Sequence, residues 1–514
     1  MWHPSYHGAT WMRPPSVSYF ASSDSLRVED YQELLDRGWR RSGSLLYKPD
    51  PQRSCCPHYA IRLKAADLKT SRDQRQAINR WNRFVLGEEY IKEISRRQPK
   101  TREDKKRQKT EFNLLAAVHQ SEYDDQRDDL PTLPSSDAGA EAEDNTNKDK
   151  NKKKQPQPPL PRPAHKLTVN LEPDSFSEEK FALFEHYQRV VHKEKPHEIS
   201  RHGFRRFLCG SPLRRRTEPA AEQSQQHPEA AETTTPAMAL AAAAPPRGGR
   251  LRHLGSYHQC YRLDGRLVAL AVLDLLPHAV SAVYFIYHSD LEAFSLGKVS
   301  ALREAALALE EGHEYYYMGY YIHGCAKMRY KAAFKPQEVL DYETGAWGPL
   351  EDVLGAMEEG GYASASLERW RKAKGEGKED GGEGQGGEER KGEDEDEGEK
   401  RKSEADPNEV PRPLRRLFLG SPREAEAAAL TMSLLDIGFA GMMSEEELME
   451  QVNLGAILIT NQKGENPQLF LTSFLVGWEE SDVKQSNSIK GIIAELVALL
   501  GPAVASRMVV RMAG

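Results

Sequence analysis

Three low-complexity segments limit what this chain can fold into. They span residues 123–163, 214–250 and 372–411. The first joins charge blocks to a proline-rich stretch, the second is mostly Ala, Pro, Glu and Gln, and the third is a Gly/Glu/Lys run. Because none holds enough apolar side chains to offset the entropy lost on ordering, we expect all three to be disordered linkers.

The remaining pieces define the predicted domains. We predict a basic N-terminal domain over 16–122, a connector over 164–213, a catalytic domain over 251–371, and a C-terminal segment over 412–514 that completes the catalytic domain. A length of 514 residues agrees with about three domains. The net charge of −7 conceals strong local segregation, since the N-terminal piece is rich in Arg and Lys.

The composition also indicates a cellular compartment. Five cysteines in a chain of this size suggest no disulfide framework and agree with a reducing environment. The longest apolar stretch, Leu267–Tyr287, is interrupted by Asp274 and Pro277, so we interpret it as two buried strands and not as a membrane span. With no secretory signal visible, we expect a soluble cytoplasmic or nuclear protein without a membrane partner.

The stretch Tyr315–Lys331 reads YYYMGYYIHGCAKMRYK and combines six tyrosines with three cations. Aromatic residues favour a strand over Tyr315–Ile322, and Gly324 marks a turn before the cationic part. Tyrosine rings beside Lys and Arg can stack nucleic-acid bases while the cations pair with phosphates. The alternative to this nucleic-acid surface is a core strand with a solvated basic end. Composition alone favours the core strand.

Local patterns predict the main elements. Asp264-Gly265 is typical of a hairpin turn, and the residues after Ser295 have the apolar spacing of a helix. Ser71 is a candidate N-cap for a basic helix. Strands, a helix and a further strand predict an α/β (α+β) layered domain. The predicted helices are Val28–Asp36, Ser71–Phe84 and Lys298–Glu310, and the predicted strands are Trp39–Tyr47, Tyr59–Leu63, Tyr257–Leu263, Leu267–Leu275, Val280–Tyr287 and Tyr315–Ile322.

Several long motifs in order carry a family resemblance. They include DRGWRRSG, SCCPHYAIRL, KTSRDQR, VHKEKPHEISRHGFRRFLCGSPL, SLGKVSALRE and YYYMGYYIHGCAKMRYKAAFKP. In this order they resemble the arginyl-tRNA–protein transferases of eukaryotes, with a fungal-like pattern. The resemblance covers all the predicted folded pieces and omits the linkers.

The resemblance implies an activity and partners. Such enzymes move arginine from Arg-tRNA to the α-amine of acceptor proteins that begin with Asp, Glu or oxidised Cys, marking them for ubiquitin-dependent degradation. Implied partners are Arg-tRNA, acceptors with acidic N-termini and ubiquitin-ligase components. The implied catalytic fold is acetyltransferase-like (GNAT-type). An adaptor that binds RNA or degradation factors without catalysis stays open, whereas acetyl-CoA fits poorly because no long glycine-rich pyrophosphate loop is present.

The transfer reaction needs a base, since the acceptor amine has a pKa near 7.7–8.0 and must lose a proton. Asp274, polar within an apolar run, is the candidate to orient or deprotonate it, and a turn-capping Asp is the alternative. His258 and Gln259 are candidate hydrogen-bonding partners, and a structural role is the alternative for His258. Glu304 is a candidate carboxylate for the arginine side chain, against a simple ion pair with Arg303.

Substrate binding is assigned to a second group of residues. A helix N-terminus after Gly297 suits a single phosphate, tyrosines suit the terminal adenosine, and cations suit the tRNA backbone or the acidic side chain of the acceptor. The predicted binding residues are Ser295, Gly297, Lys298, Tyr320, Tyr321, Lys327, Arg329, Lys331, Arg40 and Arg41.

Arginine is joined to its tRNA by an ester bond that is already activated. The transfer therefore requires neither ATP nor a metal. The family nevertheless carries an N-terminal Cys-x-x-Cys pair that, with later adjacent cysteines, binds an iron–sulfur cluster or related metal. The matching stretch here, SYHGATWMRPPSVSYF, has no cysteine, and only Cys55 and Cys56 remain. Two thiolates do not complete a four-thiolate site, so we expect the cluster to be lost or a short coded segment to be missing, with His7 or His58 as weaker substitute ligands.

Overall fold

A computed structural model describes residues 17–97, 99, 101–102, 112–123, 161–219, 251–359, 362–373, 433–461 and 468–511. Most of each predicted linker lies outside these residues. Two linker boundaries differ from the prediction, because Arg216–Pro219 forms strand β6 and helix α11 continues to Ala373.

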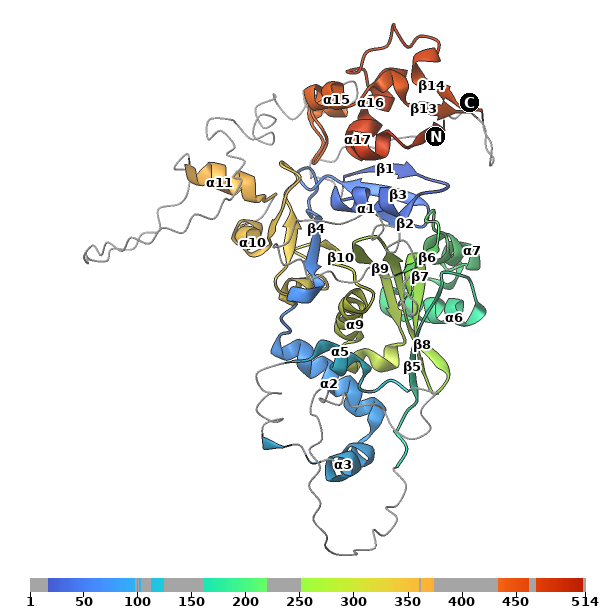
Figure 1. The fold of residues 1–514 in the computed structure, drawn as a ribbon, viewed down its shortest axis with the longest axis vertical. Coiled ribbons are helices and arrows are strands. Elements are labelled where there is room, and N and C mark those ends of the chain that lie inside the picture. The colour runs from blue at the N-terminus through green and yellow to red at the C-terminus, as the bar shows by residue number, and fades with distance from the viewer. Residues whose placement is uncertain are drawn as a thin grey trace, which may run out of the picture.

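A large mixed sheet forms the centre of the molecule (Figure 1). Its strand order is β12-β11-β4-β10-β9-β8-β7-β5, and β6 pairs with β7 outside this path. The strands are β4 Tyr59–Lys64, β5 Leu167–Pro173, β7 Leu251–Leu263, β8 Arg266–Leu275, β9 Ala279–Tyr287, β10 Tyr315–Tyr321, β11 Glu338–Leu340 and β12 Trp347–Pro349. The predicted hairpin is confirmed, with Asp264 and Gly265 both at positive φ between β7 and β8.

Helices cover both faces of this sheet. Helix α9 (Leu296–Glu310) crosses over between the parallel strands β9 and β10 and packs on one face. Helices α6 (Glu178–Tyr187) and α7 (Arg201–Phe204) cover the other face. Because side chains alternate along a strand, Ala271 and Leu273 of β8 belong to different cores from Leu270 and Val272.

The N-terminal piece contributes to two sheets. Helix α1 (Val28–Asp36) ends where predicted, and β1 (Ser18–Ser22), β2 (Arg40–Ser42) and β3 (Leu45–Pro49) form a small sheet of their own. Tyr59–Lys64 is a strand as predicted, but it does not pair with residues 39–47. It inserts between β10 and β11 of the large sheet.

The remaining N-terminal helices are α2 (Arg72–Leu86), α3 (Glu88–Arg97) and α5 (Leu114–His119). Helices α2 and α5 pack against α9, whereas α3 packs against α2. The predicted N-cap of α2 is confirmed, since Ser71 Oγ accepts from the Gln74 amide and the Gln74 side chain accepts from the Ser71 amide. This reciprocal pair satisfies two donors at the helix start.

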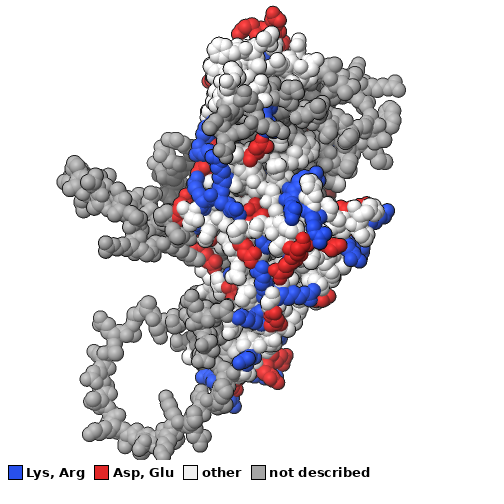
Figure 2. Space-filling view, turned by 90° about the vertical axis from the view of Figure 1, so that its right-hand side faces the viewer, with Lys and Arg blue, Asp and Glu red and all other residues white. Residues whose placement is uncertain are grey.

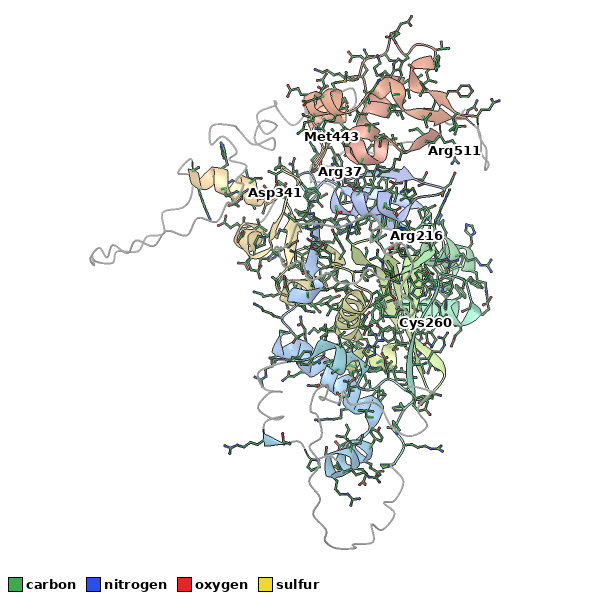
Figure 3. The ribbon with its side chains drawn as sticks, viewed as in Figure 1. Arg37, Arg216, Cys260, Asp341, Met443 and Arg511 are labelled. Atoms are coloured by element: carbon green, nitrogen blue, oxygen red, sulfur yellow. The ribbon has the colours of Figure 1, made fainter. Side chains whose placement is uncertain are left out.

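The C-terminal segment packs against the N-terminal sheet at the top of Figure 1. The indole of Trp39 donates to the carbonyl of Leu499 at 3.1 Å, and Figure 3 labels Arg37 and Met443 near this junction. The segment comprises α14 Leu434–Ile437, α15 Glu445–Gln451, α16 Ile489–Leu500, α17 Pro502–Ala505, β13 Leu458–Thr460, β14 Phe470–Leu471 and β15 Val509–Arg511, while α10 Glu351–Glu358 and α11 Ala365–Ala373 precede it.

Candidate functional site

A cavity of about 880 Å³ opens where β9 and β10 separate. The two parallel strands pair only as far as Tyr317 and Ser281, and beyond this point both line the cavity. Its wall comprises residues from 187–193, 281–292, 297–304, 316–320 and 327–331, together with Tyr31, Arg40, Arg41 and Tyr47. Elements from residues 16–122, 164–213 and 251–371 therefore meet at one site.

A bulge in β10 helps to keep the strands apart. Gly319 has φ +76°, a conformation that side chains with a Cβ rarely adopt. The register between β10 and β4 shifts between Tyr317 and Tyr320. The ammonium group of Lys331 donates to the carbonyls of Met318 and Tyr320, both at 2.8 Å, so it holds the backbone on either side of Gly319.

Glu304 lies on the cavity wall and is only 3% exposed. The hydroxyl of Tyr316 donates to its Oε2 at 2.7 Å, and the hydroxyl of Ser300 donates to Oε1. Burial raises the pKa of Glu304 to about 7, although both hydroxyls oppose this shift. A carboxyl group that titrates near neutral pH can accept a proton from an amine.

His258 and Gln259, the candidate hydrogen-bonding partners predicted with Asp274, lie on opposite faces of the sheet. Gln259 accepts from the hydroxyl of Tyr261 at 2.8 Å, and Tyr261 in turn interacts with Ser300, so Gln259 is linked to Glu304. His258 faces the opposite side, where its Nε2 bonds to the carbonyl of Leu208 at 2.9 Å. Burial lowers the pKa of His258 to about 4, and it does not line the cavity. His258 therefore has the surroundings of a structural histidine.

Asp274 also lies away from the cavity wall. Its two oxygens bind the Nε and Nη2 of Arg41 at 2.7 and 2.6 Å, and both side chains are fully buried. Arg41 also donates to the hydroxyl of Ser256 at 2.7 Å. Because both of its oxygens bind one buried guanidinium and it does not line the cavity, Asp274 positions Arg41.

The predicted binding residues are distributed unevenly. Arg40, Gly297, Tyr320, Lys327 and Lys331 line the cavity, together with Arg41. Burial lowers the pKa of Lys331 to about 8, with a further lowering by the charge of Arg40. Lys327 is exposed at the rim.

Other predicted residues have different contacts. The hydroxyl of Tyr321 bonds to His323 at 2.8 Å, and Arg329 donates to the carbonyl of His323 at 3.1 Å. Lys298 pairs with Asp73 of α2, and Ser295 accepts from Arg80 of the same helix at 3.4 Å. None of these four predicted residues, Tyr321, Arg329, Lys298 and Ser295, lines the cavity.

Sequence reasoning missed two hydroxyl groups that hold Glu304. Ser300 stands four positions before Glu304 on one helix, a spacing that places side chains together. That signal was available in the sequence. Tyr316 reaches Glu304 from β10, and only the packing of α9 on the sheet brings them together.

Cys55 and Cys56 are exposed, and all five cysteines are free. Within the described part of the chain, no group of three His, Cys, Asp or Glu side chains is placed to hold a metal ion. His7 lies outside the described residues.

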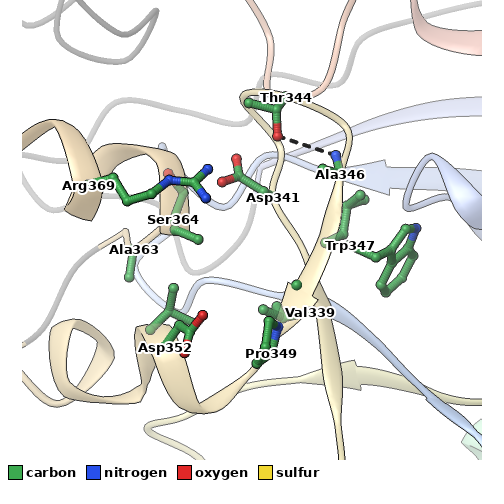
Figure 4. A pocket seen from close by; sticks show the side chains of 14 residues that line it. Val339, Asp341, Thr344, Ala346, Trp347, Pro349, Asp352, Ala363, Ser364 and Arg369 are labelled. Atoms are coloured by element: carbon green, nitrogen blue, oxygen red, sulfur yellow. Dashed lines mark hydrogen bonds between the residues drawn. The ribbon is translucent and has the colours of Figure 1, made fainter. Parts of the chain in front are cut away.

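A second cavity of about 90 Å³ lies beside β11, β12 and α11 (Figure 4). Asp341 and Arg369 point into it, and Thr344 accepts from the amide of Ala346 at 3.3 Å. This volume is roughly one tenth of the volume of the cavity between β9 and β10.

The surface shows mixed charge. In Figure 2, two groups of Lys and Arg side chains occupy the upper part of the face, with acidic side chains between and below them. Among the described helices, none is long and apolar enough to cross a membrane.

Comparison with known proteins places the chain in a family. Residues 12–76 match the model described as "Arginine-tRNA-protein transferase, N terminus", and residues 179–341 match the corresponding C-terminal model. Arginyl-tRNA–protein transferase 1 of Arabidopsis thaliana is 26% identical over 465 residues, covering 65% of this chain and 70% of the relative. The Saccharomyces cerevisiae protein of the same name is 30% identical over 337 residues, covering 66% of this chain and 54% of that relative.

A shorter similarity reaches a bacterial transferase. Aspartate/glutamate leucyltransferase of Pseudomonas putida is 48% identical over 80 residues, which are 16% of this chain and 34% of the bacterial protein. Both matched groups are named as aminoacyl transferases. With its N- and C-terminal models in order, and with relatives in plants and yeast, this chain belongs to the arginyl-tRNA–protein transferase family.

Proposed function

We propose that this protein transfers arginine from Arg-tRNA to the N-terminal α-amine of acceptor proteins. The observation that carries the proposal is the cavity between β9 and β10, with the buried Glu304 on its wall, inside the region that matches the family model. The reaction forms an amide between the arginyl carbonyl and the acceptor nitrogen. It breaks the ester to the tRNA, which leaves with a proton on its terminal hydroxyl.

The catalytic fold is proposed to be of the acetyltransferase type. Its support is the parallel pair β9–β10, which separates after three paired positions, with α9 as the crossover helix. The separation leaves room for an extended substrate between two strands.

Glu304 is proposed as the group that accepts the proton of the acceptor amine. The amine has an ordinary pKa of 7.7–8.0, and the pKa of Glu304 is about 7. This close match permits proton transfer without a large free-energy cost. Tyr316 and Ser300 orient the carboxylate by donating to its two oxygens.

The alternative role for Glu304 is to bind the guanidinium of the transferred arginine. A planar guanidinium fits a carboxylate through two hydrogen bonds. Replacement of Glu304 distinguishes the two roles, because a base acts on turnover whereas a recognition group acts on substrate selection.

The test uses Arg-tRNA labelled on arginine and a peptide beginning with Asp. Wild-type protein should label the peptide, and Glu304→Gln should lower kcat by roughly two to four powers of ten at unchanged KM for Arg-tRNA. In wild type, kcat should rise with pH through about 7 as Glu304 loses its proton, and the variant should lose this dependence.

Two other results would contradict these proposals. A raised KM for Arg-tRNA with kcat preserved would assign Glu304 to arginine recognition. If wild-type protein labels no peptide while a related transferase does so in parallel, the proposed function itself fails.

The tRNA end is proposed to enter beside the exposed Lys327, where a cation meets the phosphate backbone. Tyr320 and Gly297 also line this cavity and are available to the terminal adenosine. No ATP, metal or iron–sulfur cluster is assigned to the chemistry, because an ester is already activated.

We propose the role of arginylation in protein degradation from the family to which the chain belongs. Acceptors would begin with Asp, Glu or oxidised Cys, and arginylation would direct them to ubiquitin ligases for degradation. We place this role in the cytoplasm or nucleus.

A further inference from the structure

Two neighbouring arginines on β2 have opposite electrostatic surroundings. Arg41 is neutralised by Asp274 through two short hydrogen bonds. Arg40 has no ion pair with any carboxylate in the described residues, although it is only 5% exposed. A buried cation without a counter-ion is costly, so this contrast needs an explanation.

The hydrogen bonds of Arg40 leave part of its guanidinium unused. Nη1 donates to the carbonyls of Trp39 at 2.7 Å and Leu35 at 3.3 Å. Nε and Nη2 have no hydrogen-bond partner within the described structure. Buried donors without a hydrogen-bond partner are rare in proteins, and a catalytic or binding role is one established reason for them.

Aromatic rings partly compensate the charge. The guanidinium carbon lies 5.4 Å from the ring centre of Tyr317 and 5.2 Å from that of Tyr320. Such cation–π contacts stabilise a cation without neutralising it. The rings also limit how the guanidinium can turn.

The cavity brings a second cation to the same region. Lys331 lines it beside Arg40, and the two charges repel each other. The carboxylates on the described cavity wall are Glu304, which is held by two hydroxyls, and Glu292, which is exposed. A small anion entering the cavity would relieve the repulsion between Arg40 and Lys331.

We propose that Arg40, assisted by Lys331, binds the side-chain carboxylate of the acceptor's first residue. This inference rests on the proposed function and names the group that selects acidic acceptors. A carboxylate on a short side chain is small enough to reach the buried guanidinium of Arg40. A tRNA phosphate is bulkier and would bind the exposed Lys327 at the rim. Arg40 would thus act on acceptor choice and not on tRNA binding.

The test compares peptides that differ only in their first residue, Asp against Asn and Glu against Gln. Wild-type protein should prefer the acidic peptides in kcat/KM. Arg40→Gln should reduce this preference by about 100-fold, mainly through the KM for peptide, because the buried charge that selects the carboxylate is gone. The KM for Arg-tRNA should stay unchanged.

Arg37→Gln is the matched control. Arg37 is another largely buried arginine with an unpaired Nε, but it does not line the cavity. This variant should keep the preference for acidic peptides. Arg40→Lys, which keeps the charge, should retain part of the preference, and thermal unfolding of each variant checks the fold.

A binding measurement keeps the inference testable if Arg40→Gln does not fold. The Asp peptide should raise the Tm of wild-type protein more than the Asn peptide does, and Arg40→Lys should reduce this difference. Equal Tm shifts by both peptides would overturn the inference.

The remaining outcomes are distinct. Undiminished acid preference in a folded Arg40→Gln protein overturns the role of Arg40 while leaving arginine transfer intact. A higher KM for Arg-tRNA with equal losses for Asp and Asn peptides would assign Arg40 to a tRNA phosphate and also overturn it. Absence of transfer by wild-type protein with any peptide would instead contradict the proposed function.

Discussion

At the scale of single residues, the pair Arg41–Asp274 shows how burial decides a role. A carboxylate in an apolar strand suggested a catalytic group, yet both of its oxygens bind one guanidinium. Glu304 accepts hydrogen bonds from two neutral hydroxyls and lines the cavity. Because Glu304 lines the cavity and Asp274 does not, Glu304 is the candidate to accept the proton of the substrate amine.

Replacing Asp274 tests this distinction. Asp274→Asn should lower the free energy of unfolding by about 3 kcal/mol, since it leaves the buried Arg41 without its counter-charge. Denaturant unfolding measures the loss, and a double variant with Arg41→Met should recover part of it. If Asp274→Asn has normal stability and its turnover falls by two or more powers of ten, the sequence-based prediction of Asp274 as the base is supported instead.

At the scale of elements, the bulge in β10 creates the site. The strand pairs with β9 at its start and then turns away at Gly319, where Lys331 holds the flanking carbonyls. A strand without this bulge could continue its pairing with β9 and fill the opening. We therefore expect the cavity to depend on the left-handed conformation of Gly319.

Gly319→Ala should destabilise the protein by about 1–2 kcal/mol, the cost of a Cβ at positive φ. A new Cβ would approach no atom closer than 3.7 Å, so backbone strain and not collision is the cause. Arginine transfer should also fall, because relaxation of the strain moves the cavity wall. Gly324→Ala is the control, with open space around its Cβ, and equal unfolding energies for the two variants would contradict this account.

At the scale of the whole molecule, pieces far apart in sequence share cores. Trp39 and Leu34 pack with Val497 of α16, and Arg507 bonds to Asp30 at 2.8 Å. The C-terminal segment therefore completes a core that the N-terminal segment begins.

Truncation after residue 432 should abolish cooperative unfolding, because it exposes the apolar face of α1 and the small sheet. Deletion of residues 375–400, which lie outside the described structure, is the matched control. It should leave both the unfolding midpoint and arginine transfer nearly unchanged, since loop closure depends weakly on length. A folded, active truncation product would show that the shared core is dispensable.

The sequence alone determined what depends on neighbouring residues. Ser71 and Gln74 stand at capping-box spacing, and Asp264-Gly265 adopts the positive φ of a tight hairpin turn. Such features need no distant partner, because a cap or turn is satisfied within a few residues. The ordered family motifs also identified the family from the sequence.

Tertiary structure decided which side chains meet. Arg41 and Asp274 are 233 positions apart, so no local pattern could pair them. His258 and Gln259 were predicted together, yet alternation along β7 places them on opposite faces of the sheet. Sequence reasoning found Arg40 but not its lack of a counter-ion, because burial and pairing arise only when separate strands and helices pack around the same charge.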